Sequence, residues 1–167
     1  MAAGVVWVVD TSAILQIRRQ VPVAVRTATL SRLSDLVTVG RLKFPSEVLK
    51  ELRRHARPDA PDQLLEWAES VEGNASADAP SLDRVKDVLA VVADILDKDK
   101  DSGAEEADPY VLAFAVSLRE QAVDARVVTQ EVKDSPRKMS LNTAAGILGI
   151  PSVPLGGLLR AEQIPQG

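Results

Sequence analysis

The pattern of hydrophobic and polar positions begins with an apolar run at residues 5–9, which ends in Asp10, Thr11 and Ser12. Five apolar residues without alternation, four of them valine, are typical of a strand that is buried on both faces in a parallel sheet. Asp10 then lies at the carboxyl end of this strand, outside which open α/β sheets bind their ligands. Ser12 is expected to cap the helix that follows. The alternative is that Asp10 only supports the turn.

The rest of the chain alternates short apolar runs with helical stripes of apolar residues. Further strands are predicted at residues 42–45, 125–129 and 150–153. Helices are predicted at residues 13–19, 23–37, 49–54, 64–71, 82–96, 105–121, 141–148 and 155–161. Pro22 is expected to begin the second of these helices and Ser46 to cap the third. A polar loop is expected at residues 73–81.

Strands that alternate with helices predict a protein of the α/β class. We expect a three-layer α/β/α domain, in which helices cover both faces of a central parallel sheet and Asp10 is central at the carboxyl edge of that sheet. No stretch has the composition or length of a linker, so residues 1–167 are expected to form a single domain.

Composition limits the classes of protein to which the chain can belong. Its 167 residues, 46% of them hydrophobic, suffice for a globular domain with a full core. The absence of cysteine excludes disulfides, thiolate metal sites and a cysteine nucleophile. Aromatic residues make up only 3%, which argues against base stacking as a main binding device. No apolar run is long enough to cross a membrane and the start lacks a signal peptide, so we expect a cytoplasmic protein without membrane contact.

The net charge of −4 argues mildly against nucleic-acid binding, because nucleic-acid binders are usually basic. An enzyme that gathers carboxylates to hold a metal ion is the exception, since the bound cations change the local field.

Carboxylates recur where a predicted strand ends or a predicted helix begins. They are Asp10, the pair Glu47 and Glu51 one helical turn apart, Asp108 and Glu131. In a parallel sheet these positions meet at one edge, where clustered carboxylates stay ionised only if a cation neutralises them. Oxygen ligands favour Mg²⁺ or Mn²⁺. The alternatives are that Asp108 serves the helix dipole and that the two glutamates lie on a solvated face.

The ordered set of these segments resembles a PIN domain over roughly the whole chain. The resemblance rests on residues 10–13 (DTSA) after the first strand, 45–52 (PSEVLKEL), 107–110 (ADPY) and 127–131 (VVTQE). The helix with Trp67 and residues 148–151 (LGIP) are similar to a bacterial PIN-like subgroup.

This resemblance implies a metal-dependent endoribonuclease, a hydrolase that cuts RNA phosphodiesters at a site of four carboxylates. Carried over by position, the catalytic and metal-binding acids are Asp10, Glu51, Asp108 and Glu131. Glu51 is chosen over Glu47 because it precedes a leucine as in the family, and the choice between them stays open. Many family members have aspartate at the last position, so Glu131 is either an adapted ligand, direct or through water, or a mark of weakened activity.

Basic and hydroxyl side chains near these acids are candidates for supporting roles. Candidate RNA contacts through the phosphates are Arg53, Arg54, Lys133, Arg137 and Lys138, and the alternative for all of them is a solvated surface. Thr11 and Thr129 are candidates to orient water or an acid, or are plain turn residues. The only histidine, His55, is not expected to bind metal.

Other readings of the sequence stay open. The resemblance extends to toxin ribonucleases of toxin–antitoxin pairs, which implies a small antitoxin protein as a partner and leaves a homodimer open. Glu131 and the acidic net charge favour instead a non-catalytic PIN-like module that binds nucleic acid or protein. Residues 97–103 (DKDKDSG) resemble a calcium loop, but the sixth position is Ser102 and the twelfth is Asp108, so a polar turn fits better.

Overall fold

A central sheet of four parallel strands organises the protein in a computed structural model that describes residues 4–97 and 106–167. The strands are β1 (Val6–Val9), β2 (Leu42–Lys43), β3 (Ala125–Val128) and β4 (Ser152–Val153), in the order β2-β1-β3-β4. β1 is an interior strand with all four residues buried, as its unbroken apolar run predicts. The predicted parallel sheet, with Asp10 at the end of a central strand, is confirmed.

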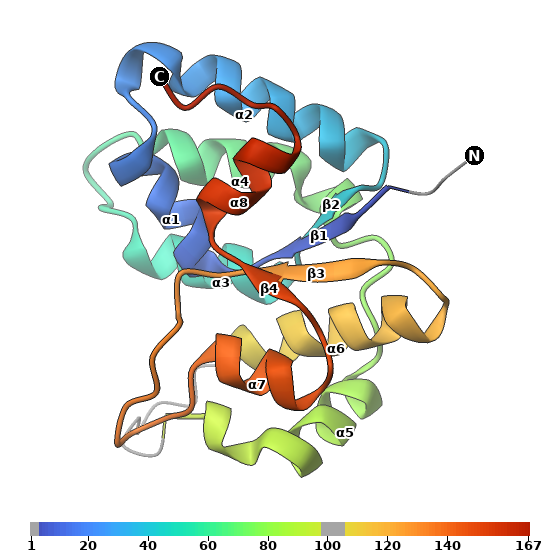
Figure 1. Cartoon of the computed structure of the whole chain (residues 1–167). Coiled ribbons are helices and arrows are strands. Elements are labelled where there is room, and N and C mark those ends of the chain that lie inside the picture. The colour runs from blue at the N-terminus through green and yellow to red at the C-terminus, as the bar shows by residue number, and fades with distance from the viewer. Residues whose placement is uncertain (1–3, 98–105) are drawn as a thin grey trace.

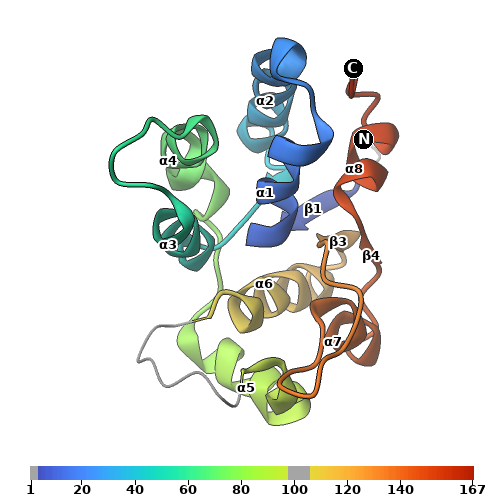
Figure 2. The ribbon, with the colours of Figure 1, turned by 90° about the vertical axis from the view of Figure 1, so that its left-hand side faces the viewer.

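Helices cover both faces of this sheet. They are α1 (Thr11–Gln20), α2 (Val23–Thr38), α3 (Ser46–His55), α4 (Gln63–Ala75), α5 (Leu82–Val92), α6 (Asp108–Glu120), α7 (Leu141–Ile147) and α8 (Leu155–Ala161), with a 3₁₀ turn, η1 (Ala93–Ile95), after α5. Figure 1 shows α1, α2, α4 and α8 on one side of the sheet and α5, α6 and α7 on the other. Figure 2, turned by 90°, shows the same two groups, with α3 beside α4. The predicted three-layer α/β/α architecture is confirmed.

The register of β1 and β3 sets the position of the residues that follow them. Val9 pairs with Val128, and the amide of Asp10 donates a hydrogen bond of 3.0 Å to the carbonyl of Val128. Asp10 and Thr129 therefore lie side by side at the carboxyl edge of two neighbouring strands.

Two predicted helix caps are wrong. Asp10, not Ser12, is the N-cap of α1, and its side chain accepts a hydrogen bond from the amide of Ala13. The reason is that α1 begins directly after β1, so the cap position falls on the last residue before Thr11. Ser46 is likewise the first residue of α3, and Pro45 precedes it at the cap position.

Other predicted boundaries also differ from the structure. The strands predicted at 42–45 and 150–153 are only two residues long, Leu42–Lys43 and Ser152–Val153. α4 continues through Gly73 to Ala75, where a polar loop was expected, because Ala75 is fully buried and its carbonyl accepts from the amide of Phe44. Packing here outweighs the low helix propensity of glycine. The helix predicted at 82–96 is α-helical only to Val92 and ends in the 3₁₀ turn.

The helix predicted at 105–121 begins only at Asp108, with Pro109 in its first turn, where proline is tolerated. Residues 98–105 of the segment that resembles a calcium loop lie outside the described residues. Within the described ranges, no helix is both long and apolar enough to cross a membrane.

Candidate metal centre

Three carboxylates from separate segments converge at the carboxyl edge of the sheet. Asp10 follows β1, Asp108 begins α6 and Glu131 follows β3. One ligand oxygen from each lies within 4.8 Å of the others, so a single cation could contact all three. Asp10 and Asp108 are buried, whereas the side chain of Glu131 keeps about a third of its surface exposed. The edge of the sheet therefore carries a cluster of three carboxylates, which is open to solvent on the side of Glu131.

Hydrogen bonds hold the carboxylate of Asp10 in one orientation. Its Oδ1 accepts from the amide of Ala13 at 3.0 Å and from the hydroxyl of Ser12 at 2.7 Å. Its Oδ2 accepts from the hydroxyl of Thr129 at 2.8 Å, and the same hydroxyl accepts from the amide of Glu131 at 3.0 Å. Thr129 thus connects the side chain of Asp10 to the backbone of Glu131.

The surroundings of Asp10 and Glu131 raise the pKa of both side chains. Burial raises the pKa of Asp10 from 3.8 to about 7, and the nearby charge of Asp108 adds to this. Hydrogen bonds from Ser12, Thr129 and Ala13 to the carboxylate oppose the rise in that pKa. Burial, followed by the charge of Asp108, also raises the pKa of Glu131 from 4.5 to about 7. The centre holds more negative charge than its surroundings stabilise, and a cation would relieve the imbalance.

The ammonium group of Lys138 already lies against two of the three carboxylates. Its Nζ is 2.8 Å from Asp108 Oδ2 and 3.2 Å from Glu131 Oε1. Burial alone would lower the pKa of Lys138, but Asp108 and Glu131 outweigh that effect and raise it above its ordinary value. Lys138, expected from the sequence as an RNA contact, is therefore part of the carboxylate centre.

Glu51, the fourth acid expected from the sequence, does not belong to the group of three. It lies close by, because the hydroxyl of Thr11, next to Asp10 in the chain, donates a hydrogen bond of 2.6 Å to Glu51 Oε1. Glu47 instead accepts from the hydroxyl of Ser46 at 3.4 Å and lies 3.7 Å from the ammonium of Lys50. Of the two glutamates, only Glu51 forms a hydrogen bond, among the described residues, with the segment that carries Asp10.

A family profile matches a region of the chain that includes the whole carboxylate centre. The profile described as "Domain of unknown function (DUF4411)" matches residues 7–165. The chain belongs to this family. No curated protein matches the chain. The DUF4411 region contains the three carboxylates, Lys138 and every strand except the first residue of β1.

In this DUF4411 domain, all three arginines that are expected to contact RNA lie near carboxylates. Arg53 is 3.4 Å from Glu69, and Arg54 is 3.9 Å from Glu51. Arg137 is 3.1 Å from Asp97. All three arginine side chains are exposed, and ion pairs of exposed side chains carry little net stability. Lys133 is exposed, and the role of this set in RNA binding stays a prediction.

His55, the last residue of α3, is exposed and is not a member of the carboxylate group. Sequence reasoning missed the contact of Lys138 with the acids, since it sits in an irregular segment where no periodicity fixes its direction. It also missed Ser12 as a donor to Asp10, although a hydroxyl two residues after a capping aspartate is a signal for such a bond.

Proposed function

We propose that this protein is a metal-dependent ribonuclease that hydrolyses RNA phosphodiesters at the centre formed by Asp10, Asp108 and Glu131. The observation that carries the proposal is the convergence of three carboxylates within 4.8 Å at the carboxyl edge of a parallel sheet. An all-oxygen donor set suits a hard divalent cation, and we propose Mg²⁺ or Mn²⁺. The resemblance of the surrounding segments to PIN domains supplies the reaction and the substrate class.

The donor set fits such an ion. Two acids have a pKa raised to about 7, which an adjacent cation would lower again, and Asp10 is held in place by three hydrogen bonds. A bound divalent ion would supply Lewis-acid polarisation of the phosphodiester and a water of lowered pKa.

The side chains of the centre have separate tasks in the proposed reaction. Asp10 and Asp108 are buried and provide fixed oxygen donors, whereas Glu131 lies on the exposed side, where substrate and water arrive. Hydrolysis adds the oxygen of water to phosphorus and breaks the bond to one ester oxygen, which leaves with a proton. Water is the proposed nucleophile, and the hydroxyls of Ser12 and Thr129 donate to Asp10 and hold its carboxylate in place.

Glu51 is proposed to act through Thr11 rather than as one of the three closest donors. Because the hydroxyl of Thr11 donates to Glu51, the carboxylate braces the first residue of α1, next to Asp10. Lys138 would leave the carboxylates when an ion binds, and its charge would then be available to a substrate phosphate.

A second candidate function is a PIN-like module that binds without catalysis. The position of Lys138 favours it, because the ammonium group already supplies positive charge to Asp108 and Glu131. The resemblance to toxin ribonucleases extends the first proposal to a cytoplasmic toxin that a small antitoxin protein silences.

The experiment that separates the two functions is an RNA cleavage assay with purified protein. End-labelled single-stranded and hairpin RNAs are incubated with EDTA, Mg²⁺ or Mn²⁺. The ribonuclease proposal predicts cleavage with at least one ion and none with EDTA. A folded protein that cuts neither RNA with either ion would contradict the proposal and favour the binding module.

A further inference from the structure

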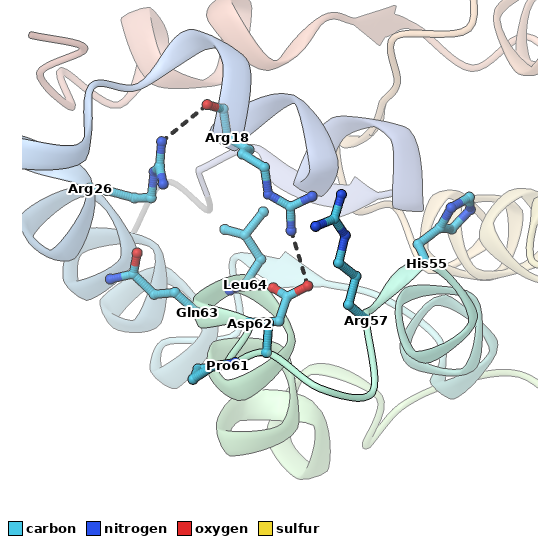
Figure 3. Close-up of a pocket in the computed structure, with 9 residues that line it drawn as sticks. Arg18, Arg26, His55, Arg57, Pro61, Asp62, Gln63 and Leu64 are labelled. Carbon is cyan, nitrogen blue, oxygen red and sulfur yellow. Dashed lines mark hydrogen bonds and ion pairs between the residues drawn. The ribbon is translucent and has the colours of Figure 1, made fainter.

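Two adjoining cavities form a groove beside the metal centre. The first, of about 420 Å³, is lined by Arg18, Arg26, His55, Arg57 and the segment 60–64 at the start of α4 (Figure 3). The second, of about 360 Å³, is lined by Ser12, Leu15, Gln16, Arg18, Arg19, His55 and Gln130. Since both share Arg18 and His55, they are continuous. We call the combined hollow, with Arg18, Arg19, Arg26, His55 and Arg57, the arginine groove.

One end of the arginine groove is lined by residues next to the carboxylate centre. Ser12 and Gln130 line that end. The hydroxyl of Ser12 donates to Asp10 Oδ1 at 2.7 Å and accepts from the amide of Gln130 at 3.0 Å. Gln130 directly precedes Glu131 in the chain. A ligand that lies along α1 in the groove would therefore end beside Ser12 and Gln130, which separate the cavity from Asp10 and Glu131.

The groove is positively charged although the chain has a net charge of −4. Its lining holds four arginines and a single carboxylate, Asp62, which lies 3.0 Å from Arg18 and also caps α4. The side chains of Arg19 and Arg57 are exposed and make no hydrogen bond or ion pair with the described part of the chain. The buried Nε of Arg26 likewise has no hydrogen-bond partner among the described residues.

Figure 3 shows the side chains of Arg18 and Arg57 both reaching into the first cavity. Arg18 has a carboxylate partner there, Asp62, whereas Arg57 has none within the described ranges. Guanidinium groups that outnumber the carboxylates of a hollow are suited to phosphate, which they bind through two parallel hydrogen bonds. The positions of the arginines thus indicate an anionic ligand with more than one phosphate.

We infer that the arginine groove binds the backbone of a single-stranded RNA whose scissile phosphate lies at the carboxylate centre. This inference rests on the proposed function. The groove follows α1, whose ten residues span about 15 Å. Each cavity has the size of a pocket for one small molecule, roughly 300–1,000 Å³, which suits nucleotides of one strand better than a duplex.

The lining also determines the kind of recognition. It contains no tryptophan, tyrosine or phenylalanine, and the imidazole of His55 is the single aromatic ring in the lining of the two cavities. Contacts made by arginine to phosphate position a strand without reading its sequence. We therefore expect binding that depends strongly on salt and weakly on base sequence.

Binding in EDTA tests the groove independently of cleavage. The anisotropy of a fluorescent twelve-nucleotide RNA is followed with the wild type and with the double variant Arg19→Ala/Arg57→Ala. The matched control is Arg84→Ala/Lys86→Ala, which removes the same charge from the exposed surface of α5 in the opposite helical layer.

The dissociation constant of the groove variant for the RNA should be at least about tenfold higher than that of the wild type. The dissociation constant of the control variant should stay within about twofold of the wild-type value. The slope of log affinity against log salt should fall by about 1.4 for the groove variant, or ~0.7 for each lost phosphate contact. Equal affinities of the groove and control variants, both correctly folded by circular dichroism, would overturn the inference.

Two competitors test the nature of the ligand. A duplex of the same length should compete less well than the single strand, and equal competition would overturn the assignment to a single strand. An oligoglutamate of equal charge should compete poorly. Competition as strong as that of RNA would assign the groove to an acidic peptide and overturn the inference.

The outcome for the groove is distinguishable from the outcome for the proposed function. If the protein cleaves RNA with metal and the groove variant binds RNA as tightly as the wild type, the ribonuclease proposal is supported and the inference that the groove binds RNA is contradicted. Arginine-dependent RNA binding by a protein that cuts no RNA would support the groove and contradict the nuclease.

Discussion

Lys138 Nζ lies 2.8 Å from Asp108 Oδ2, next to the cluster of three carboxylates that we propose as a metal centre. The same nitrogen is 3.2 Å from Glu131 Oε1. An ammonium group and a metal ion that use the same oxygens cannot occupy them together at full strength. The lysine therefore partly neutralises the acids in the absence of metal and competes with an entering ion.

Removing this ammonium group should strengthen metal binding and weaken the metal-free fold. We expect Lys138→Met to lower the dissociation constant for Mn²⁺ by about fivefold or more, as measured by calorimetric titration. Without metal, its free energy of unfolding should fall by about 2 kcal/mol, because charge-assisted hydrogen bonds to buried acids are lost. Lys133→Met, at an exposed position, is the control and should change neither quantity. Weaker Mn²⁺ binding by Lys138→Met would show that the lysine supports the ion.

The stability of the metal-free protein should fall as the pH rises. The pKa values of Asp10 and Glu131 in the folded state, both about 7, lie above the ordinary values of 3.8 and 4.5. The folded state thus binds protons more tightly than the unfolded chain. This tighter binding makes its full contribution to the free energy of unfolding below about pH 4, and the contribution is lost as the pH rises through 7. Melting temperatures in EDTA should decrease from pH 5 to pH 8.

Asp10→Asn provides the control for this pH dependence, because it removes the buried charge and keeps the size of the side chain. Its melting temperature in EDTA should exceed that of the wild type at pH 8 and approach it at pH 5. Added Mn²⁺ should raise the melting temperature of the wild type more at pH 8 than at pH 6, since an ion binds the deprotonated acids. A wild type that becomes more stable between pH 5 and pH 8 in EDTA would contradict the raised pKa values.

Much of this centre could be predicted from the sequence, for identifiable reasons. The unbroken apolar run before Asp10 predicts an interior parallel strand, and parallel strands bring their carboxyl ends to one edge. Because Glu131 follows another predicted strand and Asp108 begins a helix, the meeting of these acids was predictable without knowing any side-chain contact.

What could not be predicted depends on tertiary packing. Glu47 and Glu51 are four residues apart on one helix, and only the placement of α3 against α1 brings Glu51 to Thr11. Lys138 lies in an irregular segment, where no spacing rule directs a side chain. The capping role of Asp10 depends on α1 beginning directly after β1, and helix boundaries are less well defined in sequence than the helices themselves.

Thr129 should be a positioning residue for Asp10 and Glu131. Thr129→Val keeps the shape of the side chain but removes the hydroxyl that donates to Asp10 and accepts from the amide of Glu131. We expect Mn²⁺ affinity to fall by roughly 10- to 100-fold, as for other partners that orient metal ligands. Thr38→Val, at an exposed position near the end of α2, is the matched control. Unchanged Mn²⁺ affinity in Thr129→Val, measured by calorimetry, would show that the hydroxyl does not position a ligand.

Glu131→Asp tests whether the glutamate is an adapted ligand. The oxygen of Glu131 already reaches the group of three, so a side chain shorter by one methylene should withdraw from it. We expect about tenfold weaker Mn²⁺ binding and slower RNA cleavage. Faster cleavage by Glu131→Asp than by the wild type would identify Glu131 as a mark of weakened activity.

The rate of RNA cleavage by Asp10→Asn tests the central claim most directly. The asparagine keeps the size and most hydrogen bonds of Asp10 but loses the charge that would hold an ion. Single-turnover cleavage of labelled RNA with saturating Mn²⁺ is compared with that of the wild type and of Asp35→Asn, the same change at an exposed position on α2. Loss of a metal ligand should reduce the rate by about a thousandfold, or roughly 4 kcal/mol, while Asp35→Asn cleaves like the wild type. Equal cleavage by folded Asp10→Asn and by the wild type would contradict a catalytic metal centre at this edge of the sheet.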